Sequence, residues 1–246
     1  MTSVRTLAAH DLVALRYPRE PTPRDALAIA IGRAIDRSLA EMSHLAADGR
    51  RPTQSGLLRY GTEQLDLALE EVEEIPAAEV RARMLEELAG SIRAFRQSEL
   101  LGLRRPRSRL VLIGERAGYF AQPDFWDGRN RFFEMKSYRA VPPPPDVALQ
   151  LQLFQLAYPK FVGILVCFDR HRSPVETVRF PVPELSASES DDLLRFAYRS
   201  AAEQGEEKVL EYLLQPVVRY PFPRDPEAPG PEGPAPGGRL TESTKV

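Results

Sequence analysis

Apolar residues recur at helical spacing through most of the N-terminal part of the chain. In the stretch 22–46 they fall on one helical face: Leu27, Ile31, Ile35 and Leu39. Thr22 and Asp25 have the residue types and the spacing of a capping box at the start of this helix. The stretches 62–75 and 77–101 show the same periodicity, with a proline between them. This part of the chain is therefore expected to be mostly helical.

The pattern then changes from helical to extended. The stretches 109–126 and 131–140 are rich in apolar and aromatic residues, and the dipeptide Asp127-Gly128 lies between them. Apolar runs joined by Asp-Gly are typical of a β-hairpin. The rest of the chain predicts a helix, a buried strand, an edge strand and a last helix at 147–158, 160–170, 176–184 and 188–214.

Prolines separate these elements and mark the end of the folded part. Four consecutive prolines at 142–145 are expected to form a stiff, non-helical spacer, after which Asp146 caps the next helix. From residue 221 onward, the chain is dense in Pro and Gly and has too few apolar residues to form a core. The segment 221–246 is therefore predicted to be disordered and dispensable for folding.

The order of elements predicts an α/β fold in which a small mixed β-sheet is flanked by helices. We expect a helical N-terminal part at 1–107, a core at 108–220 and a tail at 221–246. The net charge of −2 gives no overall basic signal, so any phosphate-binding surface must be a local patch. One cysteine, Cys167, excludes an internal disulfide and any metal site that needs several thiolates from this chain.

Targeting signals are also missing from the sequence. The first 16 residues contain no apolar run of the kind found in a secretion signal. No segment approaches the roughly 20 apolar residues that a membrane span requires. A cytoplasmic protein without a membrane partner is expected.

A charged triplet is the strongest candidate for chemistry. Asp124 lies in the first predicted strand of the hairpin, and Glu134 and Lys136 lie in the second. Side chains two apart on a strand share a face, so Glu134 and Lys136 project together from a strand whose other residues are apolar. Lysine is a minority choice here, because only four of the 33 basic residues are lysines. An ion pair at a sheet edge is the alternative explanation.

The chain contains a second match to the same spacing. Asp192 is followed by Glu206 and Lys208, but these residues lie in the predicted helix 188–214. On a helix, side chains two apart point about 200° away from each other, which would exclude a shared site.

The stretch PDFWDGRNRFFEMK at 123–136 resembles the signature of the PD-(D/E)xK nuclease superfamily, whose short gap here is similar to that of lambda-type exonucleases. In the RecB-type branch, a Gln-x-x-x-Tyr motif follows the catalytic strand, and Gln150 and Phe154 have this spacing. The Gly-x-x-x-His motif of that branch corresponds to GRAID, which places Asp36 at the position of the histidine. The resemblance implies a restriction-endonuclease-like core and a nuclease that acts in DNA repair, recombination or defence.

The resemblance also implies a set of roles. Asp124 and Glu134, with Asp36 as a further candidate, would hold Mg²⁺ or Mn²⁺. Lys136 would stabilise the attacking hydroxide and the transition state, and Gln150 would bond to the site or to DNA. The four-cysteine iron–sulfur cluster of many RecB-type nucleases is excluded by the single cysteine. A basic run offers candidate DNA contacts: Arg104, Arg105, Arg107 and Arg109.

Two classes of function remain open at this stage. The first is a metal-dependent deoxyribonuclease, and the second is an inactive nuclease-fold protein that binds nucleic acid or scaffolds a complex. No P-loop motif is present, so any unwinding would require a separate helicase or repair-complex subunit as partner.

The local turn signal conflicts with the proposed site. A two-residue turn at Asp127-Gly128 would pair Asp124 with Arg131 and place Glu134 on the opposite face, because a slip of one residue inverts every side chain. A loop with an odd number of residues restores the shared face, and a five-residue loop at 127–131 would put Asp124 directly opposite Glu134. We therefore expect an odd loop or a bulge.

Overall fold

The computed structural model describes residues 3–19, 22–72, 76–138, 140–172, 174–210, 213 and 215–221. Within these ranges the helices are α1 (Ala9–Arg16), α2 (Pro23–Ala47), α3 (Gln54–Leu69), α4 (Ala78–Arg96), α5 (Pro145–Ala157) and α6 (Ala187–Gln204). The strands are β1 (Ser3–Ala8), β2 (Arg109–Ile113), β3 (Ala117–Ala121), β4 (Phe125–Trp126), β5 (Arg131–Lys136), β6 (Val162–Asp169), β7 (Glu176–Pro181), β8 (Glu206–Val209) and β9 (Val217–Tyr220).

The described strands form two mixed sheets. Sheet A has the order β8-β1-β3-β2-β9 and sheet B the order β4-β5-β6-β7. In sheet B, β5 and β6 are parallel, while β4 and β7 run antiparallel to their neighbours. The expected α/β class with a mixed sheet and flanking helices is confirmed, but the strands divide into two sheets where one was expected. The edge position expected for the segment around β7 is also confirmed.

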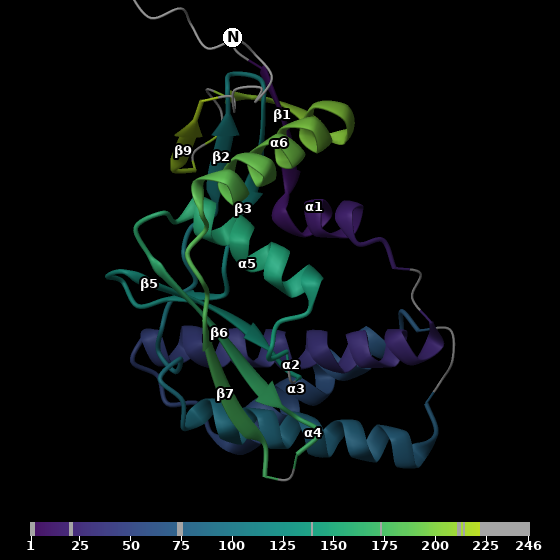
Figure 1. Ribbon diagram of the computed structural model, residues 1–246. Helices are drawn as coiled ribbons and strands as arrows, with labels where there is room; N and C mark the ends of the chain where they lie inside the picture. Colours follow the sequence, from purple (N-terminus) through teal and green to yellow (C-terminus); the bar gives the residue numbers. More distant parts are fainter. Residues whose placement is uncertain are drawn as a thin grey trace, which may run out of the picture.

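Helices α2, α3 and α4 form a layer on one side of sheet B, whereas α5 lies between sheet B and sheet A (Figure 1). The capping box of α2 is present, with the Asp25 amide donating to Thr22 Oγ1 at 3.3 Å and the Thr22 amide donating to Asp25 at 2.9 Å. Helix α3 begins eight residues before the predicted start at Thr62. It contains Gly61, where a Cβ would lie 2.8 Å from Ser38 Oγ and 2.9 Å from Leu88, so a glycine permits close packing of three helices.

The proline run gives a second correction. Pro145 is the first residue of α5 and Pro144 is its N-cap, so the last of the four prolines is helical and Asp146 is not the cap. Proline is tolerated in a first helical turn because the amide there has no intrahelical partner. Asp146 lies in the first turn of α5, and Arg19 is 3.2 Å from its carboxylate.

The predicted helix at 188–214, with Gly205 as a possible break, is wrong beyond that glycine. It ends at Gln204, and residues 206–209 form β8, which pairs with β1 at the edge of sheet A. A Cβ at Gly205 would lie 2.4 Å from the Ala201 carbonyl oxygen and 2.8 Å from the Thr6 amide nitrogen, so only glycine fits where the chain turns. Glu206 and Lys208 therefore share a strand face after all, and their charged atoms are 3.4 Å apart in an exposed pair.

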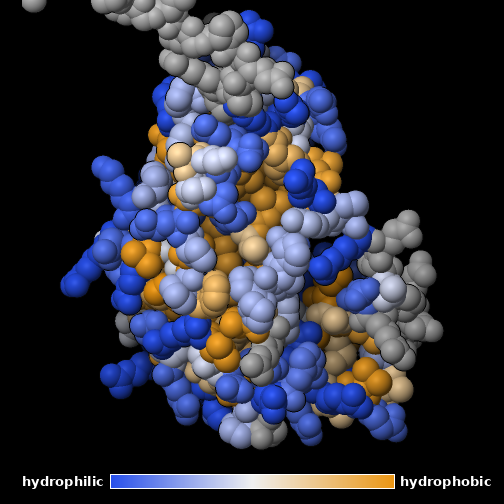
Figure 2. All heavy atoms as spheres, viewed as in Figure 1, coloured by the Kyte–Doolittle hydropathy of each residue, from blue (hydrophilic) through white to orange (hydrophobic). Residues whose placement is uncertain are grey.

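Two apolar clusters meet at sheet B. One fills the space between α2, α3 and α4 and the face of sheet B that carries Phe125, Phe133 and Met135. The other surrounds α5 and includes Phe132. In the space-filling view, apolar atoms are also exposed around α1 and α5 (Figure 2), where Leu15 of α1 is 38% exposed.

Tyrosine hydroxyls anchor the end of α5 to sheet A. Tyr119 of β3 donates to the Leu153 carbonyl oxygen at 2.9 Å, and Tyr220 of β9 donates to that of Leu156 at 2.8 Å. The Leu156 carbonyl group is one of the last four of α5, which have no amide partner further along the helix, and the Leu153 carbonyl group lies one residue before them. Sheet A therefore fixes the position of α5 and of the residues that α5 carries.

Two further expectations concern the C-terminal tail and membrane-spanning segments. Almost all of the predicted tail, 222–246, lies outside the described residues. None of the described helices has both the length and the apolar composition needed to cross a bilayer.

The hairpin between β4 and β5 decides the geometry of the site. Its pairs are Phe125 with Phe133 and Trp126 with Phe132. The loop at 127–131 is closed by a hydrogen bond from the Asp127 amide to the Arg131 carbonyl oxygen at 3.2 Å. The odd loop is confirmed, and the next pair in this register is Asp124 with Glu134.

Asp127 holds the odd loop in place. Its carboxylate accepts bonds from the amides of Arg129, Asn130 and Arg131 at 2.9–3.1 Å and from Arg131 Nε at 2.8 Å. Burial alone would raise the pKa of Asp127, but the bonds from Arg131 and the backbone amides outweigh it and lower the pKa to about 2. The ionised carboxylate therefore stabilises the longer loop in place of the two-residue turn that Asp127-Gly128 favours locally.

We expect Asp127→Ala to lower the free energy of unfolding by about 2 kcal/mol at neutral pH, because three loop amides lose a charged acceptor. A carboxylate with a depressed pKa stabilises the fold above its ordinary pKa of 3.8, and that contribution is lost as the pH falls toward 2. Urea unfolding from pH 7 to pH 2 measures this difference. A gap between wild type and variant that stays constant below pH 4 would contradict the assignment, and Asp127→Asn, which keeps an acceptor oxygen, should lose less.

Candidate active site

The hairpin brings two carboxylates together. Asp124 immediately precedes β4, and its Oδ2 accepts a hydrogen bond from the Met135 amide of β5 at 2.8 Å. This bond holds the Asp124 carboxylate beside β5, where it interacts with the side chain of Glu134. Glu134 is 4% exposed, whereas Asp124 is half-buried and lines a cavity.

Lys136 and Gln150 complete the cluster. Lys136 Nζ lies 2.8 Å from Glu134 Oε1 and 2.9 Å from Gln150 Oε1. Gln150 comes from α5, whose far end is anchored to sheet A. Two of the three donor positions of the ammonium are therefore occupied by oxygens that fix its direction.

The cluster combines two carboxyl groups with one ammonium group. Burial and the charge of Asp124 raise the pKa of Glu134, although Lys136 acts in the opposite direction. Burial alone would lower the pKa of Lys136, but Glu134 and Asp124 outweigh it and raise that pKa, so the lysine stays charged. One ammonium thus faces two carboxylates in a site of low dielectric constant.

Asp36 of α2 lies nearby but is not part of the same contact. Asp36 and Asp124 both line a cavity of about 710 Å³, together with Phe125 and Met135. The Asp36 side chain remains accessible to solvent in that cavity. The protein packed around it removes part of its hydration, and this loss together with the charge of Asp124 raises the pKa of its carboxyl group. Asp124 therefore lies between the open cavity and the buried pair of Glu134 and Lys136.

The residues fit a hard divalent cation in part. Carboxylate oxygens are the ligands that Mg²⁺ and Mn²⁺ prefer, and one or two protein carboxylates with waters are sufficient. A divalent cation beside Asp124 and Glu134 would favour the ionised form of Glu134, whose pKa is raised by burial and by the charge of Asp124. Across the described part of the chain, no three Asp, Glu, His or Cys side chains approach closely enough to form a ready-made ligand group. Ligation by Asp36 therefore stays a prediction.

Arg170 is a residue of this region that sequence reasoning missed. It follows β6, its side chain is 5% exposed, and its guanidinium donates to Ser137 Oγ at 2.8 Å and to the Ala28 carbonyl oxygen at 3.4 Å. Its Nε lies 3.1 Å from the carboxylate of Glu87 on α4. It thus connects α2, α4 and the end of β5 directly after Lys136. No local pattern distinguishes this arginine from the other arginines of the sequence.

Two sequence-based candidates have structural roles. Phe154, at the tyrosine position of the Gln-x-x-x-Tyr motif, is 3% exposed and packs edge-on against Phe132, with ring centres 6.3 Å apart. The guanidinium of Arg109 lies 4.2 Å from the centre of the Tyr158 ring and donates to the Ala157 carbonyl oxygen. Arg104 and Arg105, in contrast, line the cavity beside Asp124, and Arg107 is exposed.

Comparisons with known proteins give little further support. No protein-family model matches the chain, and no curated protein matches it. The solved structure of SSO0001 is similar over 83% of this chain and 79% of its own, with 16% identity and a TM-score of 0.37. An alkaline exonuclease (LHK-Exo) from Laribacter hongkongensis is similar over 65% of this chain and 87% of its own, with 19% identity and a TM-score of 0.34. Likenesses this weak carry no argument, so the function rests on the site itself.

We expect Arg170→Met to lower the free energy of unfolding by about 3–4 kcal/mol, because it leaves the carboxylate of Glu87 in a largely buried position without its main partner. Urea denaturation measures the loss, and the double variant with Glu87→Gln should recover part of it. Arg81→Met is the matched control. Its pair with Asp66 has a distance of 2.6 Å but is 43% and 49% exposed, so a loss below about 1 kcal/mol is expected. Equal losses in the two variants would contradict the assigned role.

Proposed function

We propose that the protein is a metal-dependent nuclease that hydrolyses phosphodiester bonds in DNA. The observation that supports this proposal is the cluster of Asp124, Glu134, Lys136 and Gln150, assembled by an odd-loop hairpin against the local turn preference. A buried carboxyl group with a second, half-buried one and a single ammonium stabilises a fold poorly, because desolvation of the charges offsets their attraction. Such a cluster is typical of a functional site.

The residues have separate tasks in this proposal. Asp124 and Glu134 would hold Mg²⁺ or Mn²⁺, with Asp36 as a further candidate ligand. When bound, such an ion supplies positive charge that favours deprotonation of a water and stabilises a phosphoryl oxygen. Lys136 contributes a second positive charge, fixed in direction before substrate arrives, at a position where negative charge develops during hydrolysis.

Gln150 and the cavity prepare the site for substrate. The amide oxygen of Gln150 keeps the ammonium of Lys136 from folding entirely onto Glu134. The cavity beside Asp124 admits a phosphate group, and Arg104 and Arg105 in its wall match that charge. The inactive alternative, a nucleic-acid-binding or scaffolding subunit, is an outcome of the test below.

We expect the purified protein to cleave linear DNA with Mg²⁺ or Mn²⁺ and not with EDTA. Lys136→Ala and Glu134→Gln should each lower the cleavage rate at least about 100-fold, because each removes a charge that acts on the transition state. Gel assays on linear, circular and single-stranded DNA measure the rates. Circular dichroism checks that the variants remain folded.

The chain supplies its own matched control. Glu206 and Lys208 have the same Glu-x-Lys spacing on a strand and also form an ion pair, but their side chains are 81% and 39% exposed. Glu206→Gln and Lys208→Ala should therefore leave cleavage unchanged within about twofold. A folded wild-type protein that cleaves no nucleic acid with any divalent metal would contradict the nuclease proposal and support the inactive alternative. Full activity in Lys136→Ala would contradict the site proposed here.

A further inference from the structure

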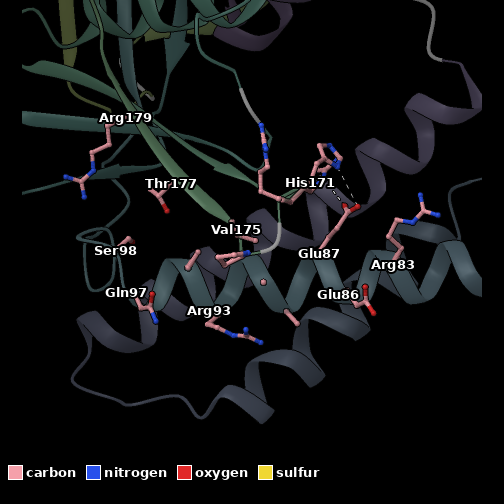
Figure 3. A pocket seen from close by; sticks show the side chains of 16 residues that line it. Arg83, Glu86, Glu87, Arg93, Gln97, Ser98, His171, Val175, Thr177 and Arg179 are labelled. Atoms are coloured by element: carbon pink, nitrogen blue, oxygen red, sulfur yellow. Dashed lines mark ion pairs between the residues drawn. The ribbon is translucent and has the colours of Figure 1, made fainter.

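A second hollow lies away from the cavity at Asp124. It is a groove of about 930 Å³ between α4 on one side and the segment from the end of β6 into β7 on the other (Figure 3). None of its lining residues also lines the cavity beside Asp36 and Asp124. The groove is therefore a separate feature of the surface.

The groove concentrates positive charge. Its lining includes five arginines, Arg83, Arg93, Arg170, Arg172 and Arg179, against two acidic residues, Glu86 and Glu87. These formal charges leave the groove three units positive, whereas the whole chain has a net charge of −2. A local field of opposite sign to the net charge attracts an anionic ligand to that place.

The arginines differ in how far they are already neutralised. Arg170 pairs with Glu87 and is buried. Arg179 lies 3.3 Å from Glu99, and Arg172 lies 3.8 Å from Asp169. The side chains of Arg83 and Arg93 are exposed and make no ion pair or hydrogen bond with any other described residue. These two carry the charge that is available to a ligand.

The spacing suits a repeating anion. Arg83 and Arg93 are ten residues apart on α4, which corresponds to about 15 Å along the helix axis. One strand of a nucleic acid presents a phosphate about every 3.4 Å along the duplex axis, so the two arginines would reach phosphates four to five steps apart. Gln97, Ser98 and Thr177 add uncharged donors of the kind that bind phosphate oxygens.

The groove is also connected to the candidate active site. The guanidinium of Arg170 lines the groove and donates to Ser137, the residue that follows Lys136 on the catalytic strand. One buried side chain therefore separates a ligand in the groove from the end of the strand that carries Glu134 and Lys136.

We propose that this groove binds the sugar–phosphate backbone of a nucleic-acid strand, as a contact remote from the cleaving residues. The proposal rests on the proposed nuclease function for the identity of the ligand. The arginines of the groove support a phosphate ligand, because the planar guanidinium can donate two parallel hydrogen bonds to one phosphate group. Arg83 and Arg93 act as binding residues that hold the substrate and take no part in hydrolysis.

The test compares two charge reversals in the full-length chain. Arg83→Glu with Arg93→Glu changes the groove, and Arg96→Glu with Arg199→Glu makes the same charge change at exposed helical positions outside it. Both pairs are placed in the Lys136→Ala background so that DNA stays intact. Fluorescence anisotropy with labelled single-stranded and duplex DNA then measures Kd over a range of salt concentrations.

We expect the groove pair to raise Kd at least tenfold and the control pair to change it less than about twofold. Two lost phosphate contacts should also reduce the slope of log K against log salt by about 1.5. Equal weakening by both pairs, or no binding of either DNA form by the parent variant, would overturn the groove assignment. Binding of poly-glutamate instead of DNA, abolished by the groove pair, would overturn it in favour of an acidic protein partner.

Failure of the groove and failure of the nuclease proposal give different results. If DNA binding depends on the groove but the wild-type protein cleaves no DNA with any metal, the nuclease proposal is wrong and the groove proposal stands. With both pairs made in the wild-type background, equal rates of metal-dependent cleavage of long DNA by the groove pair and the control pair would overturn the groove and support the nuclease.

Discussion

The opposition of Asp124 and Glu134 across one hairpin is the constraint on which the site depends. Two carboxylates approach there in a place where one of them is almost fully buried, and a single lysine faces both. A one-residue change in the loop would send Glu134 to the other face of sheet B, toward Phe133 and Met135. The hydrogen bonds between Asp127 and the loop amides therefore determine the register, and through the register the position of Glu134.

The rest of the fold supports this hairpin from two sides. On one side, tyrosines from sheet A bind the end of α5, and α5 carries the Gln150 oxygen that orients Lys136. On the other side, Arg170 connects α2 and α4 to the residue after Lys136. The helix that contributes Asp36 and the helix that lines the arginine groove are thus both fixed relative to β5.

The second Glu-x-Lys in the chain shows what environment adds to a motif. Glu206 and Lys208 have the spacing of Glu134 and Lys136, lie on a strand and form an ion pair. Their side chains are 81% and 39% exposed, compared with 5% and 19% in the hairpin. Water screens the exposed pair, so the attraction between its charges is weak and a cation would gain little by binding there. The pair of Glu134 and Lys136 differs from the pair of Glu206 and Lys208 because it is buried and lies next to a further carboxyl group, that of Asp124.

The sequence by itself determined the features that depend on local chemistry. The capping box of α2, the period of α4, the strands around Glu134 and Lys136 and the candidate residues all follow from residue type and spacing. The odd loop also followed, once Asp124 and Glu134 were required to share a face. Only the tertiary structure decided that a second sheet exists, because β1, β8 and β9 are short and pair with segments far away in the chain. The same holds for Arg170 and for the groove beside α4: a side chain becomes buried or a surface becomes charged through neighbours that are distant in sequence, and no local pattern encodes them.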